Sequence, residues 1–136
     1  MKKVFLFMAV CLPMFIFTAC SNDDDDDVYN DVSGAYAYYY QDSFEGIEYK
    51  DGYVIWFEKD KCHYSGLTDN TNPSLWADWV RWAPLPGCPG WYFEEDQNHH
   101  VYSYVVDGST IIVSNGDILT KDGNNIYRDG TKYAKL

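Results

Sequence analysis

Residues 107–136 read DGSTIIVSNGDILTKDGNNIYRDGTKYAKL, and four Asx-Gly pairs divide this stretch into short segments. The pairs are Asp107-Gly108, Asn115-Gly116, Asp122-Gly123 and Asp129-Gly130. Asn-Gly and Asp-Gly tolerate the positive φ that tight hairpin turns require. The segments between the pairs are rich in Ile, Val, Thr and Tyr, which favour strands. The stretch therefore predicts an antiparallel meander, with strands over 101–106, 110–114, 117–121, 126–128 and 132–135.

The sequence before this stretch predicts strands of the same kind. Residues 34–41 alternate, which places Tyr36, Tyr38 and Tyr40 on one face of a strand. Asp51-Gly52 predicts another turn, and further strands are predicted over 47–50, 53–58, 61–65 and 91–95. A sheet of eight to ten antiparallel strands must close as a barrel or split into a sandwich to cover its edges. We expect an all-β, up-and-down meander that closes as a small barrel of about eight strands.

Residues 70–83 depart from this pattern. The segment 70–74 offers capping residues and Pro73 near a helix start. Several apolar residues then fall within one arc at 100° per residue, and Pro84 and Pro86 prevent continuation. These apolar residues are Leu75, Trp76, Trp79, Val80, Trp82 and Ala83. The segment predicts a single helix of about ten residues, which must dock on the sheet because so short a helix is marginal alone.

The first 20 residues have the three parts of a secretory signal. Lys2 and Lys3 are basic, residues 4–17 are apolar, and Ala19 is a small residue before Cys20. The apolar run is shorter than the roughly 20 residues of a membrane-spanning helix. We expect a signal peptide over 1–19, a tether over 20–29 with five consecutive aspartates, and a single domain over 30–136. An ordinary signal peptide, with Cys20 unmodified, is the alternative.

Three resemblances extend this interpretation. Phe17-Thr18-Ala19-Cys20 resembles the lipobox of bacterial lipoproteins, which implies that Cys20 carries acyl chains such as palmitate and anchors the protein in the outer membrane. The aspartate run resembles the acidic stretch of surface-exposed lipoproteins of the Bacteroidetes, which implies display at the cell surface; a periplasm-facing anchor is the alternative. Gly34-Ala35-Tyr36, Val54-Ile55-Trp56-Phe57 and the tail over 104–136 resemble the small lipocalin-like β-barrel lipoproteins of the same bacteria.

The cysteines and the net charge restrict the partners further. Cys11 would leave with the signal and Cys20 would take lipid, so Cys62 and Cys88 remain as a pair. Beyond the inner membrane such a pair predicts a disulfide, with two buried thiols as the alternative. The formal net charge of −11 disfavours nucleic acid and anionic membrane surfaces as partners, apart from the membrane that the lipid itself enters.

The sequence contains none of the common catalytic motifs that we sought. It has no glycine-rich phosphate loop, no Gly-x-Ser-x-Gly elbow and no His-Glu-x-x-His zinc helix. His99-His100, with His63 and the acidic residues 94–96, is the only cluster that suggests a metal, and a solvated polar loop is the favoured alternative. We therefore expect no catalytic residue, no metal and no cofactor, and a protein that is not an enzyme.

The aromatic residues carry the remaining functional signal. All 13 Tyr and all five Trp follow residue 28. Trp76, Trp79, Trp82 and Trp91 are the candidate ligand-binding residues, at the mouth of a non-catalytic binding module for a small apolar molecule or a glycan. The alternative is a structural or interaction subunit of a cell-envelope complex, in which the same tryptophans are core and the acidic surface meets a basic partner.

Overall fold

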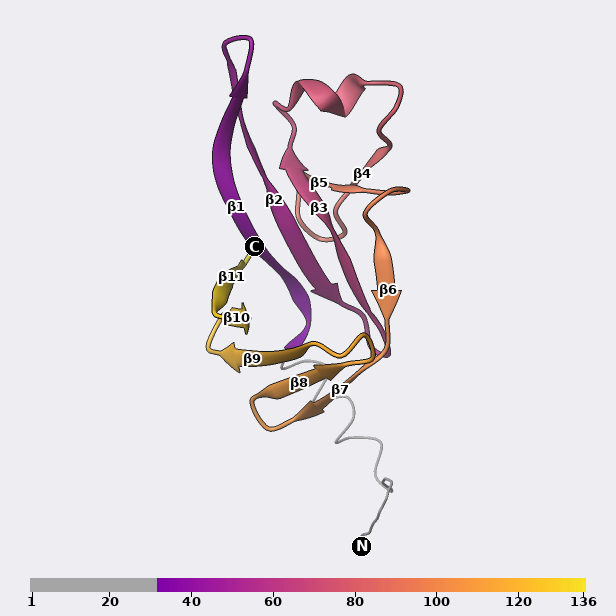
Figure 1. Ribbon diagram of the computed structural model, residues 1–136, viewed down its shortest axis with the longest axis vertical. Helices are drawn as coiled ribbons and strands as arrows, with labels where there is room; N and C mark the ends of the chain where they lie inside the picture. The colour runs from indigo at the N-terminus through magenta and orange to yellow at the C-terminus, as the bar shows by residue number, and fades with distance from the viewer. Residues whose placement is uncertain (1–31) are drawn as a thin grey trace, which may run out of the picture. The chain divides into compact units, whose positions relative to one another are not determined.

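The computed structural model describes residues 32–136, which form one compact unit built on an antiparallel sheet with almost no helix (Figure 1). The all-β prediction is confirmed. The predicted signal peptide over 1–19, the predicted tether over 20–29 with Cys20, and residues 30 and 31 of the predicted domain lie outside the described residues. The elements are β1 (Gly34–Phe44), β2 (Ile47–Phe57), β3 (Cys62–Asp69), the 3₁₀ turn η1 (Pro73–Trp76), β4 (Trp82–Pro84), β5 (Trp91–Glu94), β6 (His100–Tyr102), β7 (Tyr104–Asp107), β8 (Thr110–Val113), β9 (Ile118–Asp122), β10 (Asn125–Arg128) and β11 (Thr131–Lys135).

The strands follow the order β4-β5-β3-β2-β1-β11-β10-β9-β8-β7, and β6 pairs with β3 beside this path. The predicted closed barrel is wrong, because β4 and β7 end the sheet. On the side of β3 that faces away from β2, two strands pair with it. Leu67–Asp69 at its end pair with β5, and Cys62–Tyr64 at its beginning pair with β6. The segment that follows changes partner at Ser103, after which β7 pairs with β8. The inserted strands β4 and β5 thus occupy an edge that a closed barrel would need.

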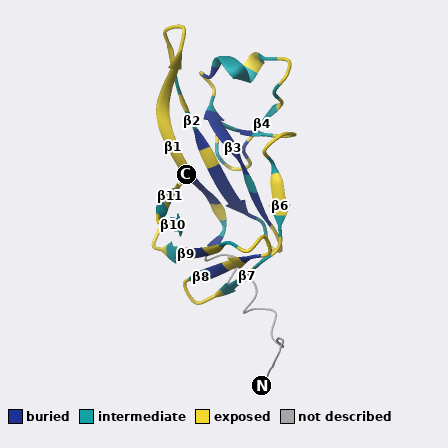
Figure 2. Cartoon of the chain, in the orientation of Figure 1, coloured by how far each residue is buried: buried dark blue, intermediate teal, exposed yellow. Residues whose placement is uncertain are grey.

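Strands β1, β2 and β3 form a central sheet that is covered on both faces. Tyr36 is paired with Ile55, and both side chains enter one cluster, the C-terminal core. The neighbouring pair, Ala35 and Trp56, points to the opposite face and enters a second cluster, the insert core. Strands β8 to β11 supply the rest of the C-terminal core, whereas Leu85 and β5 supply that of the insert core. Alternation along each strand therefore serves two cores, and Figure 2 shows the buried residues concentrated in β2 and β3.

The turns in the tail are confirmed. Gly108, Gly116, Gly123 and Gly130 all have positive φ, at 63°, 100°, 62° and 81°. Each of them lies in a turn or bend between successive strands from β7 to β11. The Asx-Gly signal was therefore sufficient to place this part of the chain.

The predicted turn at Asp51-Gly52 is wrong, because β2 runs without interruption from Ile47 to Phe57. The hairpin turn is instead Glu45-Gly46, with φ values of 52° and 83°. Gly52 is paired with Tyr39 inside the ladder, and a Cβ at this position would lie 2.0 Å from the backbone oxygen of Tyr38. The glycine is needed for a close approach of two strands, not for a turn.

The predicted ten-residue helix is also wrong. The predicted start is present, since Asn72 caps the turn by accepting a hydrogen bond from the Ser74 backbone N–H at 2.8 Å, and Pro73 opens it. The turn ends at once, because Ala77 is extended with φ −78° and ψ 143°. Residues 82–84 pair with β5 instead. Trp and Val are weak helix formers, so strand pairing outweighs a helix that was marginal.

The predicted disulfide is not formed. Cys62 and Cys88 are both free. Cys62 is buried in the C-terminal core, whereas Cys88 packs against the insert core. The two thiols thus lie on opposite faces of the central sheet, which a spacing in sequence cannot reveal.

We expect the two thiols to differ in reactivity. Burial, and to a lesser degree the charge of Asp117, raises the pKa of Cys62 from 9.0 to about 12, and burial also raises the pKa of Cys88. Because the thiolate is the reactive form, Cys62 should react with Ellman's reagent only after unfolding, and the half-buried Cys88 should react first. The folded state favours the protonated Cys62 thiol, so its contribution to stability is complete below pH 9 and is lost as the pH rises toward 12. A Cys62–Cys88 peptide in a non-reduced digest would contradict the prediction.

Candidate functional site

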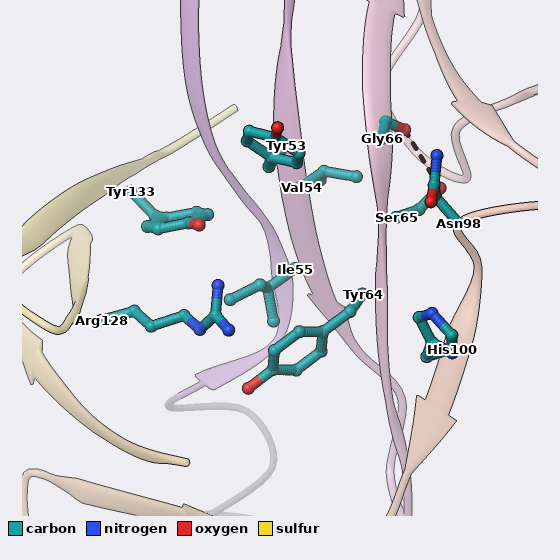
Figure 3. Close-up of a pocket in the computed structure, with 10 residues that line it drawn as sticks. All are labelled: Tyr53, Val54, Ile55, Tyr64, Ser65, Gly66, Asn98, His100, Arg128 and Tyr133. Carbon is teal, nitrogen blue, oxygen red and sulfur yellow. Dashed lines mark hydrogen bonds between the residues drawn. The ribbon is translucent and has the colours of Figure 1, made fainter. Parts of the chain in front are cut away.

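A pocket of about 190 Å³ opens on the C-terminal core side of the central sheet (Figure 3). Tyr53 and Tyr64 come from β2 and β3, and Tyr133 and Arg128 come from β11 and β10. Asn98 and His100 line the side nearest β6. The walls thus join three tyrosine rings to amide, imidazole and guanidinium groups. We call this cavity the tyrosine pocket.

One wall of the pocket is held by a network around Asp117. Tyr64 Oη and Arg128 Nε both donate to Asp117 Oδ2 at 2.9 Å, and the Arg128 guanidinium lies 5.4 Å from the centre of the Tyr64 ring. Burial alone would raise the pKa of Asp117, but the hydrogen bonds from Tyr64 and Arg128 outweigh it and leave this pKa lowered. Burial and the Asp117 hydrogen bond raise the pKa of Tyr64. At neutral pH this network therefore combines a carboxylate behind the wall with a guanidinium and a protonated phenol that line the pocket.

The four candidate tryptophans do not come together as predicted. Trp76 and Trp79 are 70% and 75% exposed, whereas Trp82 and Trp91 are partly buried. Trp91 packs against the insert core and its ring lies 4.9 Å from that of Tyr39. None of the four lines the tyrosine pocket. The expected grouping depended on a helical periodicity that residues 77–83 do not adopt.

A second aromatic surface lies on the β1–β2 hairpin and leads into the pocket. The register places Tyr38 opposite Tyr53, Tyr40 opposite Asp51, Asp42 opposite Tyr49 and Phe44 opposite Ile47. We call these eight residues the hairpin face. The Tyr38 and Tyr133 rings lie 6.2 Å apart, and Tyr53 belongs to both surfaces, so the hairpin face and the pocket are continuous.

Six of the eight residues of the hairpin face are exposed, with exposed fractions of 42% for Tyr38, 46% for Tyr40 and 56% for Phe44, whereas Tyr49 and Asp51 are partly buried. Figure 2 shows the outer hairpin as a largely exposed arm. Alternation did place Tyr36, Tyr38 and Tyr40 together from sequence. The other half of the face was missed because Asp51-Gly52 was interpreted as a turn, which separated Tyr49 from Tyr53.

Two histidines form a third cluster, on the insert core side. His63 Nδ1 lies 2.8 Å from His99 Nε2, and His63 Nε2 lies 2.6 Å from Glu58 Oε2. The His63 ring stacks on Trp56 with centroids 4.4 Å apart. Burial first, and then the charge of His63, lowers the pKa of His99. The cluster ties the loop before β6, which carries Asn98 and leads into His100, to the central sheet.

Within residues 32–136, no group of three or more His, Cys, Asp and Glu side chains is arranged to hold a metal ion. The metal interpretation needed His99 and His100 together, with His63 as a helper; His99 does meet His63, but His100 lines the tyrosine pocket. Neighbouring residues at the start of a strand point to opposite faces, which separates the two imidazoles.

The comparisons with known proteins add no family to this description. No family model matches the chain, and neither a curated protein nor a solved structure does. No helix among the described residues is long and apolar enough to cross a membrane.

Proposed function

We propose that the protein is a non-catalytic binding module, anchored by lipid at the bacterial cell surface, that binds a glycan in the tyrosine pocket. One observation carries the proposal: Tyr53, Tyr64 and Tyr133 converge on one pocket together with Arg128. Aromatic rings stack on the C–H faces of sugar rings, while the phenol, amide and guanidinium groups meet the sugar hydroxyls.

The pocket suits a sugar better than a fatty acid or another apolar ligand. Its volume of about 190 Å³ is below the roughly 300–1,000 Å³ of pockets that enclose drug-sized ligands. Arg128, Asn98 and His100 lie in its walls, and a wholly apolar ligand would remove these groups from water without replacing their hydrogen bonds. The open aromatic surface of the hairpin provides room for a longer chain beside the pocket.

The anchor is the second part of the proposal. Cys20 carries acyl chains such as palmitate, and the run of aspartates is a solvated spacer between the outer membrane and the domain. The resemblance of both segments to surface lipoproteins of the Bacteroidetes supports an outward orientation. A periplasm-facing anchor is the alternative.

An interaction subunit of a cell-envelope complex is the second candidate function. The exposed Trp76 and Trp79 favour it, since tryptophans with more than two thirds of their surface in solvent are typical of protein contacts. In this alternative the tyrosine pocket would bind no small ligand.

We expect Tyr53→Ala to weaken glycan binding by about tenfold, as for truncation of a central aromatic contact. Tyr53 is 55% exposed, so the variant should fold normally. The measurement is titration calorimetry against a panel of glycans, with fatty acids as the contrasting ligands. Trp79→Ala is the matched control, because it removes an exposed ring outside the pocket. Binding of fatty acids without any glycan would contradict the proposal.

A further inference from the structure

The outer part of the hairpin face alternates tyrosines with carboxylates. Tyr40 is opposite Asp51, and in the next row of this face Asp42 is opposite Tyr49. Each carboxylate thus has a tyrosine across the ladder and another beside it on its own strand, two residues away. The Tyr49 hydroxyl lies 3.5 Å from Asp42 Oδ2, and the rings of Tyr38 and Tyr40 lie 6.3 Å apart.

Within residues 32–136, no ion pair joins either of these carboxylates to a lysine or an arginine. Among the described residues the ion pairs involve Glu58, Glu95 and Asp117, and neither Asp42 nor Asp51 takes part in one. Lys50 alternates to the opposite face of the hairpin, where its Nζ lies 6.0 Å from the centre of the Trp91 ring. The outer hairpin face therefore presents two unneutralised negative charges among aromatic rings.

The titration of these groups is consistent with an uncompensated negative field. The charge of Asp51 is the largest cause that raises the pKa of Tyr40, followed by burial. Burial, and then the charges of Asp42 and Asp51, raise the pKa of Tyr49. Burial raises the pKa of Asp51, and the charge of Asp42 adds to this effect. A cation placed among these four side chains would offset the charges of Asp42 and Asp51 that raise these pKa values.

We propose that the outer hairpin face binds the ammonium groups of an amino-sugar glycan. The inference rests on the proposed glycan function and names the class of the glycan. An ammonium group is attracted both by the faces of tyrosine rings and by carboxylates. Uronic acids and sulfated sugars are disfavoured, because these carboxylates and the net charge of −11 repel them.

The dimensions favour a chain over a single sugar. From the Tyr38–Tyr53 pair to the Phe44–Ile47 pair the hairpin extends about 20 Å, at 3.3–3.4 Å per residue. A linear glycan that starts in the tyrosine pocket can follow this row of rings. A lysine-rich peptide also carries ammonium groups, but it has no sugar ring to occupy the tyrosine pocket at the end of the hairpin face.

The experiment compares two probes of equal length, a glucosamine oligomer and its N-acetylated counterpart, in mildly acidic buffer that keeps the free amino groups charged. We expect the full-length protein to bind the glucosamine oligomer about tenfold more tightly, from the combined cation–π and charge contributions. The double variant Asp42→Asn/Asp51→Asn should abolish most of this preference. Glu48→Gln, which removes a negative charge from the opposite face of the same hairpin, should retain it.

The outcomes separate this inference from the proposed function. If both oligomers bind equally and the double variant changes nothing, the amino-sugar inference is overturned while glycan binding stands. If a lysine-rich peptide of equal charge binds as tightly as the glucosamine oligomer, the inference is overturned as well. If no glycan binds, both proposals fail. Urea unfolding of each variant tests whether a loss of the binding preference is caused by a loss of folded structure.

Discussion

We expect Tyr36→Ala to lower the free energy of unfolding by about 3–5 kcal/mol, as for other buried aromatic truncations. Tyr36 is 0% exposed at the centre of the C-terminal core, and its ring meets Phe57 edge-on with centroids 5.9 Å apart. Its hydroxyl donates to the backbone oxygen of Val32 at 3.1 Å. Domains of this size have only about 5–15 kcal/mol of stability in total, so this single change should leave part of the population unfolded at 37 °C.

Two further variants identify the cause of that loss. Tyr36→Phe keeps the ring and removes the hydroxyl, so it should cost about 1 kcal/mol. Tyr38→Ala changes the next tyrosine on the same face, which is 42% exposed, and should stay within about 0.5 kcal/mol of the wild type. Urea unfolding followed by far-ultraviolet circular dichroism measures all three. Equal losses of unfolding free energy for Tyr36→Ala and Tyr38→Ala would contradict the assignment of Tyr36 to the core and of Tyr38 to the surface.

We also expect Cys20→Ala to transfer the protein from the membrane fraction to the soluble fraction. Membrane burial of acyl chains contributes about 0.8 kcal/mol per CH₂, and two chains suffice for a stable anchor. Detergent phase partitioning of wild type and variant measures the change. Wild-type protein that is soluble after cleavage of its signal peptide would contradict the lipoprotein proposal.

Orientation in the membrane needs a separate variant. Replacement of residues 23–27 by serine leaves Cys20 in place and removes the acidic stretch. We expect this variant to remain in the membrane fraction but to become inaccessible to protease added to whole cells, whereas the wild type is digested. Protection of the wild type itself would favour the periplasm-facing alternative.

Local signals predicted the tail of the fold well. Each Asx-Gly pair after residue 106 favours a tight turn with a positive φ at its glycine, and the folded structure keeps this positive φ at all four glycines. The strand from Gly34 was equally clear, because its alternating tyrosines share one face, although the alternation did not show that Tyr36 is buried and Tyr38 and Tyr40 are exposed. These features depend on two or three neighbouring residues, which is the range over which sequence patterns are informative.

The features that were missed depend on contacts between distant segments. Gly52 looks like a turn glycine, and only the close approach of Tyr38 explains it. The tryptophan segment has a helical period, yet its end pairs with β5, at a position that the periodicity does not encode. The tyrosine pocket joins strands separated by about 70 residues, from Tyr53 and Tyr64 to Arg128 and Tyr133, so its composition could be read only from the assembled sheet.

The pairing of the first strand with the last determines the order in which the protein can fold. Tyr36 is paired with Lys135, and the Leu136 backbone N–H donates to the Ala35 backbone oxygen at 2.9 Å. A chain still lacking residues 131–136 would leave unpaired edges on both β1 and β10, and Tyr133 would be missing from the C-terminal core. Such sequence-distant pairing is slow, because a loop of about a hundred residues must close first. During synthesis the C-terminal core should therefore be completed only after residues 131–136 have emerged.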